Sequence, residues 1–205
     1  MKELVFASHN LNKIKEIQDL IGNKFRILSL NDLGYHEEIN ENQMNIEGNA
    51  EEKANLVFNL FHVDCFADDT GLEVEALDGQ PGVFSARFAD CTGERNQGED
   101  ISEANIRKLL KLMKDKENRK ARFRTVIVLI LDGNKFFFEG IANGHIMEKK
   151  EGGNGFGYDP VFKPTGFNKT FAEMTLKQKN EISHRAIAIN KLVRFLHSLK
   201  INNKD

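Results

Sequence analysis

Residues 121–146 read ARFRTVIVLILDGNKFFFEGIANGHI, and this stretch decides the fold class. Two long strand patterns, Ala121 to Asp132 and Lys135 to Ile146, are joined through Asp132-Gly133-Asn134. An Asp-Gly pair between two apolar runs is typical of a β-hairpin. Val126 to Leu131 is the longest wholly apolar run, and its six residues are far too few to span a bilayer. The stretch therefore predicts a hairpin with a buried strand.

Shorter strand and helix patterns surround this hairpin. The expected strands cover Leu4–Ala7, Phe25–Leu30, Cys65–Ala67 and Leu72–Leu77. The expected helices begin near Asn12, near Asn49 (with Ala50, Ala54, Val57, Leu60 and Phe61 on one face) and at about Glu99, and the last carries Ile182, Ala186, Ile189, Val193 and Leu196 on one face. Helices interleaved with strands, plus one long hairpin, indicate an α/β fold with a mixed sheet. No linker divides the pattern, so we expect residues 1–205 to form a single domain.

The composition is that of an ordinary soluble globular protein. The 205 residues are 40% hydrophobic and 29% charged, with a formal net charge of −2. This balance lacks the basic excess of a general nucleic-acid binder. The N-terminus lacks the apolar stretch of a secretory signal, and Cys65 and Cys91 have no metal-type spacing. We expect a cytoplasmic protein that binds neither nucleic acid nor membrane, with both cysteines buried and reduced; a disulfide between them is the alternative.

The residues Ser8-His9-Asn10-Leu11-Asn12-Lys13 connect the first expected strand to the first expected helix. A strand that enters a helix through small polar residues leaves backbone N–H groups at the positive end of the helix dipole. Lys13, in the first turn, is expected beside the same point. The pattern favours binding of a phosphate group. Simple N-capping by Asn10 or Asn12, with a solvated Lys13, explains the same residues.

A second polar motif, Asp68-Asp69-Thr70-Gly71, follows directly after the buried pattern Cys65-Phe66-Ala67. We expect the strand to end there, with two carboxylates and a hydroxyl at its carboxyl end. Such a group suits Mg²⁺, which prefers oxygen ligands, or provides a base that acts on a water molecule. A polar turn is the structural alternative, because Asp, Thr and Gly are common turn residues.

Three further segments carry polar or glycine residues. Residues 34–48 form an acidic connection with Glu37, Glu38, Glu41 and Glu47, although most such runs are solvated loops. Residues 152–160 form a glycine-rich loop around Phe156, where a ligand can approach the backbone and the ring can stack on a base. His184 and Arg185 place cations at the start of the last helix, where the dipole disfavours them. They indicate an anionic or polar ligand, or are solvated charges.

Six blocks of residues occur in order along the chain. They are Ser8-x-Asn10-x-x-Lys13-x-x-Glu16, Ala67-Asp68-Asp69-Thr70-Gly71-Leu72-Glu73-Val74, Gly79-x-Pro81-Gly82-x-x-Ser85-Ala86-Arg87, Gly155-Phe156-Gly157-Tyr158-Asp159-Pro160-Val161-Phe162, Ala172-Glu173-Met174-Thr175 and Ile182-Ser183-His184-Arg185. Together they resemble the inosine triphosphate pyrophosphatase family over the whole chain. Members of that family hydrolyse inosine, deoxyinosine and xanthosine triphosphates to the monophosphate and pyrophosphate, and so remove them from the nucleotide pool.

The resemblance implies a fold, a cofactor and a set of site residues. The implied fold is an elongated mixed sheet with flanking helices, in two lobes around a nucleotide cleft; the implied assembly is a homodimer that needs Mg²⁺. The triphosphate would be held by Ser8, His9, Asn10, Leu11, Asn12 and Lys13. Asp69 would be the general base, with Thr70 also touching substrate. The nucleotide site would be lined by Phe156, Gly157, Tyr158, Asp159 and Lys179, and the base would be read by His184 and Arg185.

The metal would be bound by Glu41 together with Asp69. Here the chain departs from the family pattern, because members often carry a glutamate where this chain has Gly48. Glu47 or Glu38 is then the alternative ligand. Two other functions compete with this one: a nucleotide-binding regulatory module without turnover, and a pyrophosphatase with another base preference, such as modified pyrimidines. The Asp68-Asp69 pair favours an enzyme over a mere binder.

Overall fold

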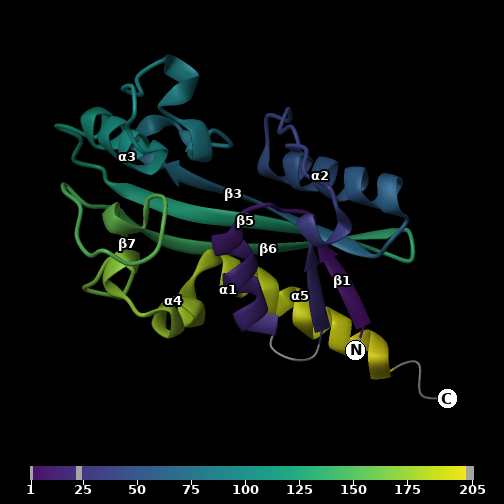
Figure 1. Cartoon of the computed structure of the whole chain (residues 1–205). Coiled ribbons are helices and arrows are strands. Elements are labelled where there is room, and N and C mark those ends of the chain that lie inside the picture. The colour runs from purple at the N-terminus through teal and green to yellow at the C-terminus, as the bar shows by residue number, and fades with distance from the viewer. Residues whose placement is uncertain (1, 22–24, 202–205) are drawn as a thin grey trace. The chain divides into compact units, whose positions relative to one another are not determined.

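A computed structural model describes residues 2–21 and 25–201 of the chain (Figure 1). The strands are β1 (Lys2–Phe6), β2 (Phe25–Ser29), β3 (Cys65–Val74), β4 (Pro81–Gly82), β5 (Lys120–Leu131), β6 (Asn134–Ile146) and β7 (Phe162–Pro164). The helices are α1 (Leu11–Ile21), α2 (Ile46–Phe61), α3 (Ile101–Leu112), α4 (Leu176–Ile182) and α5 (His184–Ile201). No helix of the described ranges is long and apolar enough to cross a membrane.

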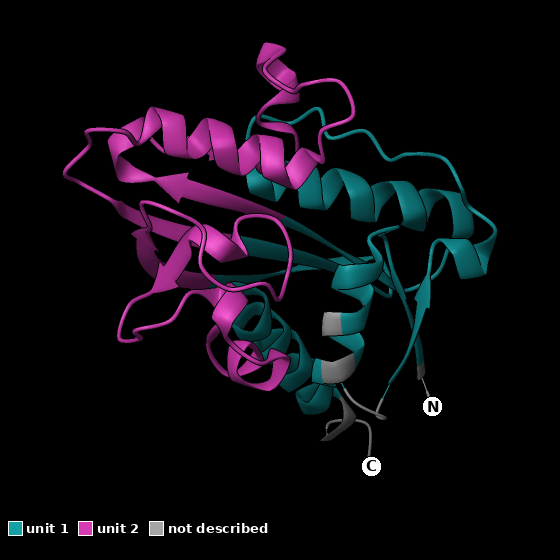
Figure 2. Cartoon of the chain, turned by 60° about the vertical axis from the view of Figure 1, so that its left-hand side comes forward, with its two compact units in different colours: residues 1–69, 125–140, 184–205 teal, residues 70–124, 141–183 magenta. Residues whose placement is uncertain are grey.

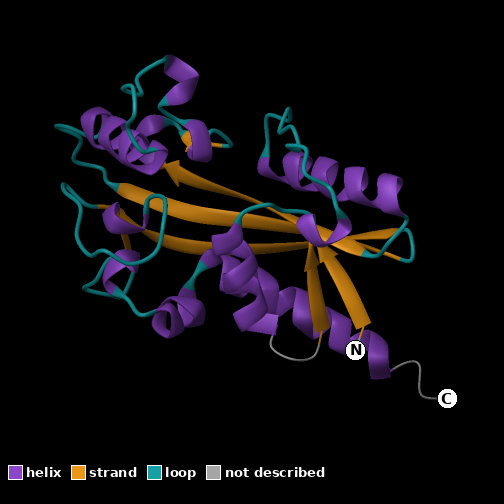
Figure 3. Cartoon of the chain, viewed as in Figure 1, coloured by secondary structure: helices purple, strands orange, loops and turns teal. Residues whose placement is uncertain are grey.

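The predicted hairpin is confirmed as β5 and β6, the two longest strands in Figure 3. Its two connecting residues, Asp132 and Gly133, both have positive φ angles, of 49° and 76°. Asp-Gly suits such a turn because both residues adopt the left-handed region more readily than most. The backbone amide of Asp132 also donates to the Asp64 carboxylate at 2.9 Å, which ties the turn to the segment before β3.

The sheet is mixed, as predicted. Its strand order is β2-β1-β3-β5-β6-β7, and β4 pairs with β3. β1 runs parallel to both β2 and β3, whereas the β3–β4 and β6–β7 pairs are antiparallel. The pairing of β1 with β3 ends at Phe6 and Phe66. Asp68 and Asp69 therefore follow on β3 just beyond the point where its neighbour β1 stops.

The chain forms two compact units, each with its own core (Figure 2). Unit 1 comprises residues 1–69, 125–140 and 184–205, and unit 2 comprises residues 70–124 and 141–183. Neither unit is continuous in sequence, which explains why the sequence shows no linker between them. The strands β3, β5 and β6 contribute residues to both units.

In unit 1, helix α2 covers one face of the strands, and α1 and α5 cover the other (Figure 1). The core joins the first strands to the hairpin and to α5, with Phe6 and Phe66 stacked at 4.8 Å between ring centroids. In unit 2, the core lies between α3, the β5 and β6 segments and the loop before α4. Within it the Phe123 ring packs on the Phe162 ring, with 4.7 Å between the ring centroids.

Two sequence-based boundaries were wrong. β3 does not end at Asp68 but continues through Asp68-Asp69-Thr70-Gly71 to Val74; buried carboxylates can stay in a strand when cations compensate them, as described below. The last helix is in fact two, α4 and α5, because Ser183 has an extended backbone (φ −71°, ψ 152°). Its amide donates to the Lys179 carbonyl and closes α4.

Two burial predictions were also wrong. Leu60, expected on the buried face of the second helix, is exposed. Cys91, expected to be buried, is exposed as well, whereas Cys65 is buried, and both are free thiols. Burial raises the pKa of the Cys65 thiol to about 12, so this side chain stays protonated and serves as core packing.

Candidate active site

The loop between β1 and α1 is closed by its own side chains. The Asn10 carboxamide oxygen accepts hydrogen bonds from the backbone amides of Asn12 and Lys13, at 3.0 and 3.2 Å. The Ser8 hydroxyl accepts from the Asn10 amide at 3.1 Å. The capping role considered for Asn10 is therefore present. Leu11 and Asn12 are exposed at the start of the helix.

His9 attaches this loop to the acidic connection that follows β2. Its Nε2 lies 2.9 Å from the carbonyl oxygen of Glu37. Its ring stacks on the Tyr35 ring, with 6.2 Å between the ring centroids. Tyr35 in turn meets Phe61 at the end of α2 edge-on, at 6.1 Å. These contacts hold residues 35–37 against the β1–α1 loop, and Glu41 lies four residues farther along the same connection.

Asp68 is buried between two cations on one face of β3. Its carboxylate accepts from Lys13 Nζ at 2.9 Å and from Arg185 Nε at 3.4 Å. Burial alone would raise the pKa of Asp68, but the charges of Lys13 and Arg185 outweigh it and hold the pKa below its usual range. For Lys13 burial dominates and lowers the ammonium pKa, against the opposing charge of Asp68. Lys13 is thus a partner of Asp68 and not a solvated side chain.

Asp69 lies on the opposite face of β3, as the alternation of a strand requires. There it contacts α2: its carboxylate accepts from Asn49 Nδ2 at 3.3 Å and from Lys53 Nζ at 3.2 Å. The same Lys53 ammonium donates to Glu41 at 2.8 Å. Burial raises the pKa of Asp69, and the nearby charge of Glu41 adds to the rise against the opposing charge of Lys53. The pKa of Lys53 is raised, because the two carboxylates outweigh its burial.

The two neighbouring carboxylates therefore differ in chemistry. The pKa of Asp68 is lowered by its two cations, whereas burial raises the pKa of Asp69. A carboxylate whose pKa is raised toward neutrality is the usual form of a general base. Within unit 1, one face of β3 thus carries a base, Asp69, with Glu41 and Lys53. The opposite face carries two cations that suit a phosphate group, Lys13 and Arg185 at Asp68.

The donor set also suits a divalent cation. Glu41 and Asp69 direct carboxylate oxygens at the same ammonium, so two acidic ligands already converge on one positive charge. Mg²⁺ in nucleotide enzymes is commonly held by one or two carboxylates, with phosphate oxygens and water completing its shell. In the described ranges no three His, Cys, Asp or Glu side chains gather as a closed metal site. Of the alternatives, Glu38 is exposed and Glu47 lies in the first turn of α2.

Sequence reasoning missed Asn49 and Lys53. Both are buried polar residues on α2, and they lie one turn apart on its buried side, together with Ala50, Ala54 and Val57. A lysine among the apolar positions of an amphipathic helix was the available signal. Long charged side chains are almost never fully buried unless they are paired.

The predicted nucleoside residues form a second cluster, in unit 2. Asp159 is buried, and its Oδ2 accepts from Lys179 Nζ at 2.8 Å and from the Phe156 amide at 2.9 Å. The Lys179 ammonium also lies 4.8 Å from the centroid of the Phe156 ring. Gly155 has a φ of +78°, and a β-carbon there would overlap the Asp159 carboxylate, so the loop requires glycine at this residue. The half-buried Phe156 and Gly157 are the accessible part of this cluster.

The remaining predicted residues are placed as follows. Tyr158 is buried and its hydroxyl donates to the Ser85 carbonyl at 3.0 Å, and burial raises its pKa. Thr70 is half-buried on β3. His184 and Arg185 are buried in the first turn of α5, in unit 1. Arg185 thereby lies with Lys13 at Asp68.

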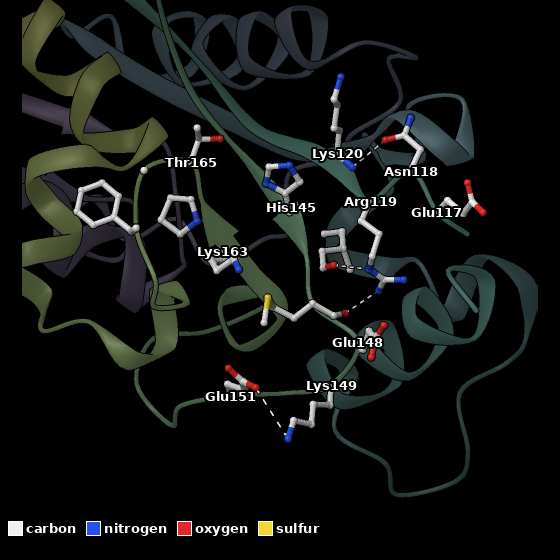
Figure 4. A pocket seen from close by; sticks show the side chains of 15 residues that line it. Glu117, Asn118, Arg119, Lys120, His145, Glu148, Lys149, Glu151, Lys163 and Thr165 are labelled. Atoms are coloured by element: carbon white, nitrogen blue, oxygen red, sulfur yellow. Dashed lines mark hydrogen bonds and ion pairs between the residues drawn. The ribbon is translucent and has the colours of Figure 1, made fainter. Parts of the chain in front are cut away.

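Unit 2 also contains a pocket of about 930 Å³, shown in Figure 4. Arg119 contributes to its wall, and its guanidinium donates to the carbonyls of Ile146 and Met147 at 2.6 and 2.8 Å. Lys120, His145 and Lys163 lie around it, together with several glutamates. None of the predicted site residues lines this pocket.

Comparison with known proteins places the chain in a family. A model of the Ham1 family matches residues 4–195, a range that includes every candidate site residue. The chain belongs to the Ham1 family. It is 51% identical to the dITP/XTP pyrophosphatase of Flavobacterium johnsoniae, over 97% of this chain and 100% of that protein. It is 48% identical to the dITP/XTP pyrophosphatase of Porphyromonas gingivalis, over 96% of this chain and 98% of that one.

Solved Ham1 structures agree with the fold. The Ham1 protein of Staphylococcus aureus matches with a TM-score of 0.84 at 36% identity, over 96% of this chain and 99% of that one. The Ham1 protein of Coxiella burnetii matches with a TM-score of 0.85 at 31% identity, over 97% of this chain and 100% of that one. These matches confirm the resemblance and the mixed α/β fold predicted from the sequence.

Proposed function

We propose that the cluster around Asp69 hydrolyses deaminated purine nucleoside triphosphates (ITP, dITP and XTP) to the monophosphate and pyrophosphate. The chain is a nucleoside-triphosphate pyrophosphatase, in line with the names of its full-length relatives. The observation that carries the assignment to this cluster is the pair Glu41 and Asp69, which share one buried ammonium while the pKa of Asp69 is raised.

In this proposal Asp69 is the general base. Its raised pKa lets it accept a proton from the attacking water, and Asn49 fixes the orientation of its carboxylate. Glu41 and Asp69 would hold Mg²⁺, which when bound supplies neutralisation of the triphosphate charge and polarisation of the phosphorus. Lys53 balances the charge of both carboxylates. The reaction needs no covalent nucleophile, because water attacks the phosphorus directly.

We assign the phosphates to residues 8–13. Backbone amides at the start of α1 and the Lys13 ammonium would stabilise the negative charge that develops on departing pyrophosphate. The nucleoside is assigned to residues 156–159 and Lys179, and base reading to His184 and Arg185. An arginine cannot give up its charge, so Arg185 would pair with a 6-keto oxygen and meet a donor clash at the 6-amino group of adenine.

Lys13→Ala is expected to raise the KM for ITP and the inhibition constant of pyrophosphate by about 10- to 100-fold, the usual value of a hydrogen bond to a charged group. Folding stability also falls, because Lys13 pairs with the buried Asp68. Steady-state kinetics and thermal unfolding measure the two effects. Lys15→Ala is the matched control, since Lys15 is an exposed lysine of the same helix. Unchanged affinity of Lys13→Ala for both ligands would remove Lys13 from the phosphate site.

The activity is tested by incubating the purified protein with Mg²⁺ and a panel of nucleoside triphosphates and assaying pyrophosphate. ITP, dITP and XTP are expected to be hydrolysed well ahead of ATP, GTP and pyrimidine triphosphates. Chelation of Mg²⁺ is expected to abolish turnover, and Mg²⁺ to restore it. A preference for a modified pyrimidine, or binding without turnover, would contradict the proposal.

We also propose that the protein acts in the cytoplasm as a homodimer. The proposal follows from the family resemblance. Light scattering of the purified protein measures its mass against the 23.3 kDa of one chain. A monomer at micromolar concentration would contradict it.

A further inference from the structure

The strand β6 passes directly against the first turn of α5, and the contact point is Gly140. A β-carbon at Gly140 would overlap the carbonyl oxygen of His184 and would lie 2.6 Å from the amide nitrogen of Ala188. Both atoms belong to the backbone of α5. A clash with backbone cannot be relieved by turning a side chain, so any larger residue at position 140 must push the helix away from the strand.

The backbone of Gly140 does not itself require glycine. Its φ lies outside the left-handed region, unlike those of Gly133 and Gly155. Residue 140 is also inside a regular strand, where glycine is less favourable than residues with a side chain. The close approach of α5 is therefore the structural reason for glycine at this position.

The first turn of α5, which packs against Gly140, also contains Arg185. Arg185 follows His184 directly, is buried, and reaches Asp68 through its Nε at 3.4 Å. This distance is already near the upper limit of a hydrogen bond, so a displacement of the first turn of α5 would alter the contact between the Arg185 guanidinium and the Asp68 carboxylate. Residues 68, 140, 184 and 185 all belong to unit 1.

We propose that Gly140 is a positioning residue for the reaction: the absence of a side chain lets α5 dock on β6 and thereby holds Arg185 at Asp68. The inference rests on the function proposed for the cluster around Asp69. Gly140 is not itself a catalytic residue, and it acts through Arg185. A misplacement of about 1 Å at a catalytic constellation can cost about 100-fold in rate.

Gly140→Ala is the test, with Gly144→Ala as the matched control. Gly144 lies in the same strand, and a β-carbon there would overlap the Lys163 carbonyl and lie 2.6 Å from the Phe162 ring. Gly140→Ala is expected to lower kcat/KM for ITP by about 10- to 100-fold per folded molecule. Gly144→Ala is expected to lower the thermal midpoint and to keep kcat/KM within about threefold, because its clash involves β7 instead of Arg185.

A double-mutant cycle with Arg185→Ala separates positioning from general loosening. If Gly140 acts through Arg185, Gly140→Ala lowers kcat/KM by less than about threefold in the Arg185→Ala background, because the two effects are coupled. An equal loss in both backgrounds, or a Gly140→Ala enzyme with the parent kcat/KM, would overturn the proposal.

If Gly140→Ala does not fold, Ala188→Val provides a milder displacement. Ala188 is fully buried in the same helix, and extra methyl groups at a well-packed core position force backbone shifts at a moderate cost in stability. Its effect on kcat/KM is expected to be smaller, in the same direction, and absent in the Arg185→Ala background; the parent kcat/KM in Ala188→Val would contradict the proposal. If the parent protein lacks pyrophosphatase activity, the proposed function fails. In that case coupling of residues 140 and 185 in the free energy of unfolding still supports the positioning role, and its absence rejects it.

Discussion

Asp69→Asn is expected to lower kcat for ITP by about 10²–10⁴-fold or more while the protein remains folded, because the amide cannot accept the proton of the attacking water. The thermal midpoint is expected to stay at or above that of the parent. The pKa of Asp69 is raised in the folded chain, so at neutral pH the ionised carboxylate costs stability that a neutral amide does not. Fixed-time pyrophosphate assays measure kcat, and thermal unfolding measures the midpoint.

The control for this variant is Asp68→Asn, and its expected result in unfolding is the reverse. The pKa of Asp68 is lowered, so its charge stabilises the fold above the ordinary carboxylate pKa, and this contribution is lost as the pH falls through the lowered value. Removing the charge that Lys13 and Arg185 share is expected to cost about 3–5 kcal/mol of unfolding free energy. If Asp69→Asn kept turnover within tenfold of the parent, Asp69 would not be the base.

Arg185→Ala is expected to lower kcat/KM for ITP by about 100-fold or more and to compress the preference for ITP over ATP. Sites built to hydrogen-bond one group can reject its replacement by about 10⁴-fold, because buried donors are left unpaired. Guanine also carries the 6-keto oxygen, so Arg185 does not distinguish it from hypoxanthine. Rejection of GTP is therefore assigned to residues 156–159, which would meet the 2-amino group of guanine. Much of the barrier to GTP is therefore expected to remain.

The ratio of kcat/KM for ITP and ATP distinguishes two roles of Arg185. A residue that only neutralises Asp68 would affect both nucleotides alike, whereas a residue that reads the base affects the ratio. Arg185→Lys is the control, since it keeps a positive charge near Asp68 but lacks the planar fork of donors. If both variants kept the preference for ITP over ATP, recognition of the base would be assigned to backbone groups of the glycine-rich loop, residues 152–160, instead of Arg185.

Several features of the site followed from local patterns alone. The hairpin of β5 and β6 follows from two apolar runs around Asp-Gly, and the motifs at residues 8–13, 68–71 and 155–160 lie in continuous segments of sequence. Local spacing gave the residue types for a phosphate site and a base. Local spacing also gave a wrong end for the third strand, which was predicted to stop at Asp68. Two adjacent carboxylates are typical of a turn, and the sequence does not show the cations that pair with them.

Those partners come from far along the chain. Lys53 is 16 residues from Asp69 and Arg185 is 117 residues from Asp68, so no local periodicity connects them. Their charges allow β3 to continue through the two aspartates, since the cost of burying a carboxylate is offset by a paired cation.

The sequence by itself therefore determined the fold class, the family resemblance and the candidate chemical groups, because secondary-structure periods and motifs depend on neighbouring residues. Only the tertiary structure decided how those groups are paired. It placed Asp68 and Asp69 on opposite faces of one strand, each with its own cations, and gave them opposite pKa shifts. It also brought Gly140 against His184, because burial and steric exclusion depend on which segments pack together in space and not on their order in the chain.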